Sequence, residues 1–278
     1  MSQVRRALTG VGFTVGIGAI LWGALRPHAP GPAEPEPNAT EVLARSGPVT
    51  AVLDRWTEGS ERGWLVATRF PRDAVVEIVP ADTAVRFSDL LPTDNEDWAA
   101  INGGFYDETG APMELVVSEG HIHHPLRARG GSGVLEADPL PARIVHRDAW
   151  QPGARMALQS IDRLVDAGQP LVASASEHRA ARSAVVIGAD AVWLVVTFSD
   201  TSAFRTDDGF QLQQTSGHGQ TLRGFATLLV DHLRAEQALN LDGAVSTQLA
   251  ARIGGQTIRV LGERGTVQAV VLRTEPSR

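Results

Sequence analysis

Short segments that alternate apolar and polar side chains run through most of the chain after residue 49. Residues 50–56 and 64–69 show this period of two, which is typical of half-buried β-strands. Residues 183–187 and 192–198 are nearly continuous apolar segments on either side of Gly-Ala-Asp, a pattern that predicts a hairpin of buried strands. Further strands are predicted at 74–79, 98–101, 115–117, 134–135, 143–145, 238–241 and 267–272.

A clear helical period occurs in one long segment, residues 221–237. Its apolar residues, from Leu222 to Leu233, recur every three or four positions. The hydroxyl of Thr221 is suited to accept a free amide of the first turn. Many strands with one dominant helix predict an α+β fold, built on a mixed and largely antiparallel sheet.

The longest segment without a regular period is the polar stretch from Ser199 to Gln220. Loops of this length are uncommon inside a compact domain, and those that occur are often lids or binding loops. We therefore expect residues 199–220 to be irregular and to lie near a site.

The N-terminal region differs from the rest. Residues 7–25 carry no charge and follow Arg5 and Arg6, and their length is close to the roughly 20 residues that span a bilayer as a helix. This predicts a signal or membrane-anchor helix over 1–26, with the chain beyond it exported. No small-x-small cleavage pattern follows Leu25, which favours an uncleaved anchor. Five prolines between Pro27 and Pro37 predict a linker over 27–46, and one domain is expected over 47–278.

Composition and charge narrow the range of functions. The net charge of −7 argues against nucleic acid as a partner, because a phosphate backbone attracts basic surfaces. The chain has no cysteine, which excludes disulfides, thiolate metal sites and a cysteine nucleophile. The expected location is extracytoplasmic, either periplasmic or at the cell surface, with membrane contact through the N-terminal segment.

Two short motifs carry candidate chemistry. The first is Asn102-Gly103-Gly104-Phe-Tyr-Asp107, at the end of a predicted strand, where the two glycines allow close approach of the backbone to a ligand. The second begins with Asp242-Gly243 after the strand 238–241 and continues to Ser246-Thr247, so that a carboxylate and two hydroxyls follow a strand end. Each motif alone is also compatible with a plain turn.

Together, and in this order, the two motifs resemble those of the phosphodiester glycosidase family. Three segments between them strengthen the resemblance, namely Gly131 to Val134, Gln159 with Arg163 to Val165, and Arg179 to Val185. The resemblance covers about residues 50–272. It implies a hydrolase that cleaves the glycosidic linkage of a sugar phosphodiester.

The resemblance also implies a set of site residues. Arg182 offers a planar group of donors that suits a phosphate, and Gly103, Gly104 and Gly243 can direct backbone amides at an anion. Glycosidic cleavage generally uses two carboxyl groups, for which the candidates are Asp242 and either Asp107 or Glu114. Asn102, Ser246 and Thr247 are expected to line the same pocket.

Two features depart from the family pattern. Ala244 and Val245 follow Gly243 where further glycines are usual, and the Gln159 segment lacks a usual Gly-Pro. A non-catalytic glycan-binding module and a structural envelope protein therefore remain alternatives to the enzyme.

The histidines do not predict a metal centre. His121 and His123 would share one face of a strand, but no cysteine or carboxylate at ligand spacing completes a set with them or with His124. His218 precedes the helix and is interpreted as a loop residue. No cofactor is predicted, and the sequence leaves the binding of a divalent cation open.

Overall fold

The computed structural model describes residues 40–139, 141–172, 178–199, 201–206, 209–214 and 217–274. The chain divides into Met1–Glu36, which lies outside the described residues, and Pro37–Arg278, which contains the fold. The predicted N-terminal helix and most of the predicted linker therefore lie outside the described part. Within that part, no helix has both the length and the apolar character needed to cross a membrane.

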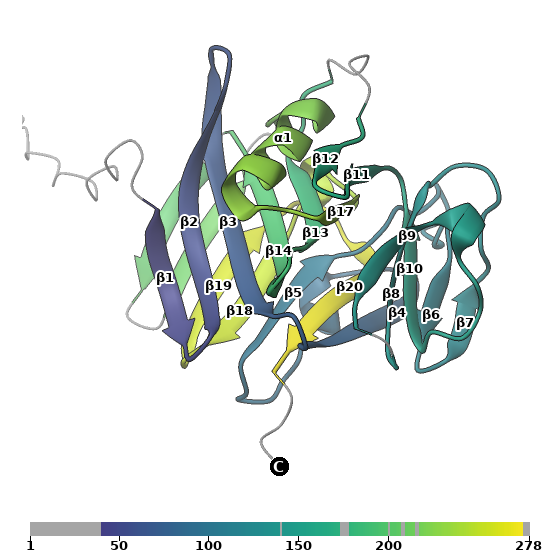
Figure 1. The fold of residues 1–278 in the computed structure, drawn as a ribbon. Helices are drawn as coiled ribbons and strands as arrows, with labels where there is room; N and C mark the ends of the chain where they lie inside the picture. The colour runs from purple at the N-terminus through teal and green to yellow at the C-terminus, as the bar shows by residue number, and fades with distance from the viewer. Residues whose placement is uncertain are drawn as a thin grey trace, which may run out of the picture. The chain divides into compact units, whose positions relative to one another are not determined.

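Three sheets make up the described fold (Figure 1). The first has the order β1 (Glu41–Ser46), β2 (Val49–Glu58), β3 (Glu61–Pro71), β14 (Ala191–Phe198), β13 (Arg182–Ile187), β17 (Gln237–Asn240), β11 (Arg163–Asp166) and β12 (Gln169–Pro170). The second has the order β15 (Thr201–Thr206), β16 (Gly209–Gln214), β19 (Gln256–Leu261), β18 (Leu249–Ile253), β5 (Trp98–Asn102), β20 (Thr266–Arg273) and β4 (Val75–Val85). The third has the order β7 (His121–His124), β6 (Val116–Ser118), β10 (Met156–Ser160), β8 (Gly133–Ala137) and β9 (Arg143–His146).

The helical part of the described chain is small. It consists of α1 (Leu222–Leu233) and the short 3-10 helices η1 (Phe87–Leu90), η2 (Arg147–Ala149) and η3 (Ala244–Ser246). Neighbouring described strands pair antiparallel, except that β16 and β19 are parallel. The predicted α+β class, with largely antiparallel sheets and one dominant helix, is confirmed for this part of the chain.

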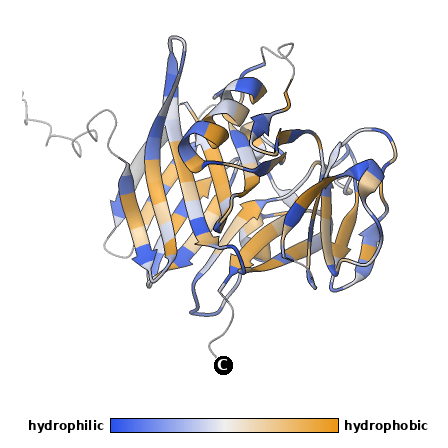
Figure 2. Ribbon diagram, viewed as in Figure 1, coloured by the Kyte–Doolittle hydropathy of each residue, from blue (hydrophilic) through white to orange (hydrophobic). Residues whose placement is uncertain are grey.

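The largest hydrophobic core lies between the inward faces of the first two sheets and continues to the third (Figure 2). Val185 and Ile187 of β13 belong to this core, whereas Ala184 and Val186 face the other way and pack with α1. Because both faces of β13 are covered, all six of its residues are buried. This explains why residues 184–187 of β13 are continuously apolar rather than alternating.

The helix α1 begins where the sequence predicts. The Thr221 hydroxyl accepts a hydrogen bond from the Gly224 amide at 2.9 Å, and the preceding strand hairpin contributes Glu58, whose carboxylate accepts the Thr221 amide at 3.1 Å. The helix ends at Leu233 rather than at 237, because Arg234 adopts a left-handed conformation with φ of 53°. The chain then enters β17, close to the predicted strand 238–241.

The expectation that residues 199–220 form an irregular loop is wrong. Much of this segment is the hairpin of β15 and β16, and β16 extends the second sheet by pairing with β19. Phe210, Leu212 and Gln214 alternate as buried positions with the partly exposed residues between them. The glutamines among these positions obscure the period of two in the sequence.

The strand β1 occupies residues that the sequence pattern assigns to the linker. Glu41–Ser46 pairs antiparallel with β2, and Ala44 is buried in the main core. The folded part of the described chain therefore begins at about residue 41 rather than at 47.

Candidate active site

The two sequence motifs, 140 residues apart, meet at the ends of β5 and β17. The Asp242 amide donates to the Gly103 carbonyl at 3.0 Å, and the Asn102 side-chain amide donates to the Asp242 carbonyl at 2.8 Å. Gly103 also lies against Gln268, so that a Cβ there would come within 2.3 Å of the Gln268 side chain. The glycine is thus required by close packing between backbone segments.

Asn102 holds this meeting point together from within the fold. Its side chain is fully buried, and its Oδ1 accepts from the Ser183 hydroxyl at 2.8 Å and from the Gln248 amide at 3.0 Å. Together with the bond to the Asp242 carbonyl, the side-chain amide of Asn102 therefore connects β5, β13 and the segment after β17. These hydrogen bonds give Asn102 a role in positioning the Asp242 segment.

Replacing Asn102 with alanine is expected to lower the free energy of unfolding by about 3 kcal/mol, because several buried partners lose their hydrogen bonds. The matched control is Ser183→Ala, which removes one of those bonds and is expected to cost about 1 kcal/mol. Denaturant unfolding of both variants provides the test. Equal stability of Asn102→Ala and the wild type would contradict the positioning role.

The Asp242 carboxyl lies in a partly buried turn. Its Oδ1 accepts from the Gly243 amide at 2.9 Å, and the Ser246 side chain donates a further hydrogen bond. Burial raises the pKa of Asp242, against the opposing effects of these hydrogen bonds and of the Arg264 charge. A raised pKa is the direction of shift expected for a carboxyl that acts as an acid–base group.

The turn after Asp242 keeps a glycine-like backbone without the usual glycine. Ala244 has φ of 53°, in the left-handed region that favours glycine, and its amide donates to the Ala181 carbonyl at 2.8 Å. The substitution of alanine at this position therefore does not imply a different turn. The presence of Ala244 in place of a glycine is therefore weak evidence that the active site has been lost.

Changing Ala244 to glycine is expected to retain activity and to raise the melting temperature slightly, because it relieves about 1 kcal/mol of left-handed strain. Part of this gain is offset by the greater freedom of glycine in the unfolded chain. Ala226→Gly, inside α1, is the control and should destabilise by about 1 kcal/mol. Thermal unfolding distinguishes the two, and a marked loss of stability in Ala244→Gly would be inconsistent with strain at this position.

Arg182 lies beside the turn that contains Asp242. Ala184 pairs with Asn240 and the Leu241 amide donates to the Ser183 carbonyl, and a Cβ on Gly243 would lie 4.0 Å from the Arg182 Cα. Arg182 is 7% exposed, and burial lowers its pKa to about 10, a shift opposed by Glu58 and Asp162. It therefore remains a cation at neutral pH.

Arg182 donates hydrogen bonds from two of its three guanidinium nitrogens to described residues. Nε donates to the Gln220 carbonyl at 3.1 Å, and Nη2 donates to the His178 carbonyl at 2.6 Å. Among the described residues, nothing accepts a hydrogen bond from Nη1. The guanidinium is thus fixed in orientation while one end can bind an anion.

Glu114 is the more suitable of the two candidates for a second carboxyl. It is 3% exposed, its Oε1 accepts from the Gly131 amide at 2.8 Å, and its Oε2 has no partner in the described part of the chain. Burial raises the pKa of Glu114, against the charges of nearby arginines. Gly131 allows this contact, since a Cβ there would lie 2.6 Å from Glu114 Oε1.

Asp107 is placed differently. It is exposed, and its Oδ1 accepts hydrogen bonds from the Thr109 amide and hydroxyl and from the Ala111 amide. These hydrogen bonds lower the pKa of Asp107, the opposite direction from Asp242 and Glu114. Its geometry is that of a turn-forming aspartate.

The remaining predicted residues lie close to the Asp242 turn. Ser246 is buried and bonds to Asp242, and Thr247 is fully buried with no partner for its hydroxyl among the described residues. Gly243 packs against the Ala181 carbonyl, and Gly104 lies near Gln159 and Ser160. Asp162, which the sequence reasoning missed, lies close enough to Arg182 for the two charges to affect each other.

The described residues contain no group of three or more His, Asp or Glu side chains arranged to hold a metal ion. His121 and His123 of β7 are exposed and line a pocket of about 450 Å³ with Glu77 and Glu119.

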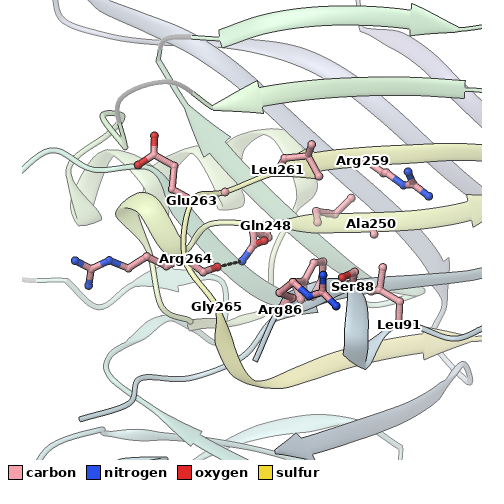
Figure 3. Close-up of a pocket in the computed structure, with 13 residues that line it drawn as sticks. Arg86, Ser88, Leu91, Gln248, Ala250, Arg259, Leu261, Glu263, Arg264 and Gly265 are labelled. Carbon is pink, nitrogen blue, oxygen red and sulfur yellow. Dashed lines mark hydrogen bonds between the residues drawn. The ribbon is translucent and has the colours of Figure 1, made fainter. Parts of the chain in front are cut away.

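A separate pocket of about 370 Å³ lies beside the Asp242 segment (Figure 3). Gln248 connects the two, since its side-chain amide donates to the Arg264 carbonyl at 2.8 Å and its backbone amide donates to Asn102. Arg86, Arg259 and Arg264 lie around a lining that includes Leu249 and Leu261. None of the sequence-predicted site residues lines this pocket.

The fold and the buried carboxyl and arginine groups define a β-rich domain with a polar candidate site, and comparison with known proteins gives its family. The family model for phosphodiester glycosidase matches residues 95–272. The chain belongs to this family. No curated protein matches the chain.

Two solved structures share the fold. A hypothetical protein from Synechocystis matches with a TM-score of 0.55 at 15% identity, over 86% of this chain and 64% of that one. The catalytic domain of zebrafish N-acetylglucosamine-1-phosphodiester alpha-N-acetylglucosaminidase, auto-inhibited by its pro-peptide, matches with a TM-score of 0.54 at 15% identity. The second match covers 85% of this chain and 88% of that chain.

Proposed function

We propose that this protein hydrolyses the glycosidic bond of a sugar phosphodiester in an extracytoplasmic glycan. The observation that carries the proposal is the buried Arg182 beside the Asp242 turn, from whose Nη1 no described residue accepts a hydrogen bond. Family membership supports the reaction class, and the zebrafish structure with the same fold is named for an enzyme of that class. The uncharged segment after Arg5 and Arg6 supports the location.

The chemistry of the leaving group suits this arrangement. When the bond between the anomeric carbon and the bridging oxygen breaks, the oxygen leaves with the phosphorus as a phosphate monoester. The second pKa of such a monoester is about 6, so at neutral pH it needs little protonation and is stabilised by a cation. Arg182 supplies that cation without giving up a proton.

The two carboxyls then serve the sugar side of the reaction. Water adds its hydroxyl to the anomeric carbon, and its proton passes to a carboxylate acting as base. We assign Asp242 as this base, or alternatively as a nucleophile that attacks the anomeric carbon before water does. Glu114 is the second of the two carboxyl groups that such a reaction uses. Asp107 is left out because it is exposed and committed to a turn.

The direct test is release of free sugar by the purified full chain from N-acetylglucosamine-1-phosphodiesters and from diesters of several other sugars, with and without EDTA. Turnover of at least one diester supports the proposal, and the EDTA arm measures metal dependence. Binding of the diesters without turnover would instead indicate a glycan-binding module.

A further inference from the structure

Three neighbouring strands end together beside Arg182. Asn240 is the last residue of β17, and its amide donates to the Asp162 carbonyl at 3.0 Å across the ladder to β11. On the other side Asn240 pairs with Ala184, two residues from Arg182 along β13. The side chains of Ala184, Ala238 and, by alternation, Asn240 and Arg182 lie on the sheet face that α1 covers.

Two buried acceptors in this region receive no hydrogen bond from the residues that the structure describes. Asn240 is 4% exposed and its Oδ1 has no partner among the described residues, and the same holds for Oε2 of Glu114. A buried polar atom without a hydrogen bond costs about 1–3 kcal/mol, so most such atoms in folded proteins are paired. A ligand that carries hydrogen-bond donors would satisfy both atoms.

Asp162 links these two acceptors. It follows β10 and precedes β11, it is partly buried, and its φ of 65° is unusual for a residue with a side chain. Burial raises its pKa against the Arg182 charge, and the Asp162 charge in turn raises the pKa of Glu114. A Cβ on Gly131 would lie 2.5 Å from the Ser160 carbonyl oxygen and 2.6 Å from Glu114 Oε1, so Glu114 lies against the end of β10, two residues before Asp162. Left-handed aspartates of this kind are often found at functional sites.

We propose that Asp162, Asn240 and Glu114 form an acceptor subsite that binds the sugar ring through its hydroxyl groups, beside Arg182, which binds the phosphate. The inference rests on the proposed function and names the sugar-binding part of the same site. Sugar hydroxyls are donors that can satisfy carboxylate and amide oxygens. A phosphate would be repelled by two carboxyls, so it belongs at the arginine end.

The same oxygens are less suited to a divalent cation. One oxygen of Glu114 already accepts the Gly131 amide, and the Arg182 guanidinium lies close to Asp162. A hard cation requires about six oxygen ligands and is repelled by a neighbouring positive charge. The neutral, donor-rich face of a sugar fits this arrangement better.

The test measures binding of two separate probes to the full chain by titration calorimetry, with ligand-observed NMR for weak binding. The probes are free monosaccharides, N-acetylglucosamine first, and methyl phosphate. Asn240→Ala and Asp162→Asn are each expected to weaken sugar binding about tenfold, which corresponds to the loss of one good hydrogen bond. Asn240→Ala is expected to leave methyl phosphate binding within about twofold, whereas Asp162→Asn should strengthen it if it changes it at all, because it removes a negative charge near Arg182. Exposed Asn95→Ala should change neither kind of binding.

Thermal unfolding separates a binding role from a structural one. Because Asn240 Oδ1 has no partner in the described part of the chain, Asn240→Ala should not lower the melting temperature. A melting temperature raised by calcium in the wild type but not in Asp162→Asn would show a cation site and overturn the proposal. Sugar binding that is absent from the wild type, or unchanged in both variants, would also overturn it.

The proposed function can fail independently. If the wild type binds sugar through these residues but hydrolyses no diester, the subsite stands and the hydrolase assignment fails. If diesters are hydrolysed with the same KM by the wild type, Asn240→Ala and Asp162→Asn, the enzyme stands and the subsite is wrong.

Discussion

Replacing Asp242 with asparagine is expected to lower kcat by about 10³-fold and, at the same time, to raise the melting temperature. The loss follows from removal of a base or nucleophile, which typically contributes a factor of 10² to 10⁴ or more. The gain in stability follows because a carboxyl whose ionisation is opposed by burial is replaced by a neutral amide of the same shape. Steady-state kinetics on a reactive sugar diester and thermal unfolding measure the two effects.

The pH dependence of stability provides a second test of Asp242. Burial raises the pKa of this carboxyl, so the folded chain retains a proton at pH values where the unfolded chain has lost it. The stabilising effect of that proton is present at low pH and is lost as the pH rises through the raised pKa. The stability advantage of Asp242→Asn should therefore widen with increasing pH.

The activity of the wild type should increase with pH, whereas the stabilising effect of the Asp242 proton decreases. If Asp242 acts as a carboxylate, kcat/KM falls as the pH drops through its raised pKa, above the ordinary carboxyl value of about 3.9. Asp107→Asn is the matched control: it removes an exposed turn carboxylate and should leave kcat within about threefold. Full activity in Asp242→Asn, or a loss as large in Asp107→Asn, would contradict the assignment.

The sequence predicts those parts of the fold in which local pattern and tertiary packing agree. The hairpin of β13 and β14 and the amphipathic α1 carry their own period, and both are found near the predicted positions. The strand β18 was not predicted, because the alanines at its centre have little intrinsic preference for strands. These alanines are buried because one face of β18 packs in the main core and the other packs in the hydrophobic cluster that includes η1. Both contacts depend on residues that are distant in the sequence.

The candidate site was predictable to a similar degree. The motifs identify Asn102 and Asp242, but not that the first is fully buried and positions the second. Spacing alone could not distinguish Asp107 from Glu114, because burial by distant segments decides which carboxyl has a raised pKa. No sequence pattern identified Asp162 as a site residue. Its left-handed backbone and its closeness to Arg182 arise only when β11 pairs with β17.

Replacing Arg182 with lysine is expected to lower kcat/KM for sugar phosphodiesters by about 100-fold, although the positive charge is kept. In the wild type, Nε donates to the Gln220 carbonyl and Nη2 donates to the His178 carbonyl, which leaves Nη1 to bind the phosphate. The single ammonium group of lysine cannot bind both carbonyls and a phosphate in the same geometry. Arg182→Ala, which also removes the charge, should lose more. Kinetics on a diester and on a neutral aryl glycoside of the same sugar provide the measurement.

The comparison of the two substrates identifies what Arg182 does. If the guanidinium stabilises the departing phosphate, the loss is confined to the diester, and hydrolysis of the neutral glycoside changes by less than about threefold. Equal losses on both substrates would mean that the substitution disturbs the fold near Asp242 instead, because the Gln220 and His178 carbonyls lose their donor. Exposed Arg45→Lys is the control for the chemical change itself. A loss specific to the diester would therefore assign the phosphate to Arg182, independently of which sugar the enzyme prefers.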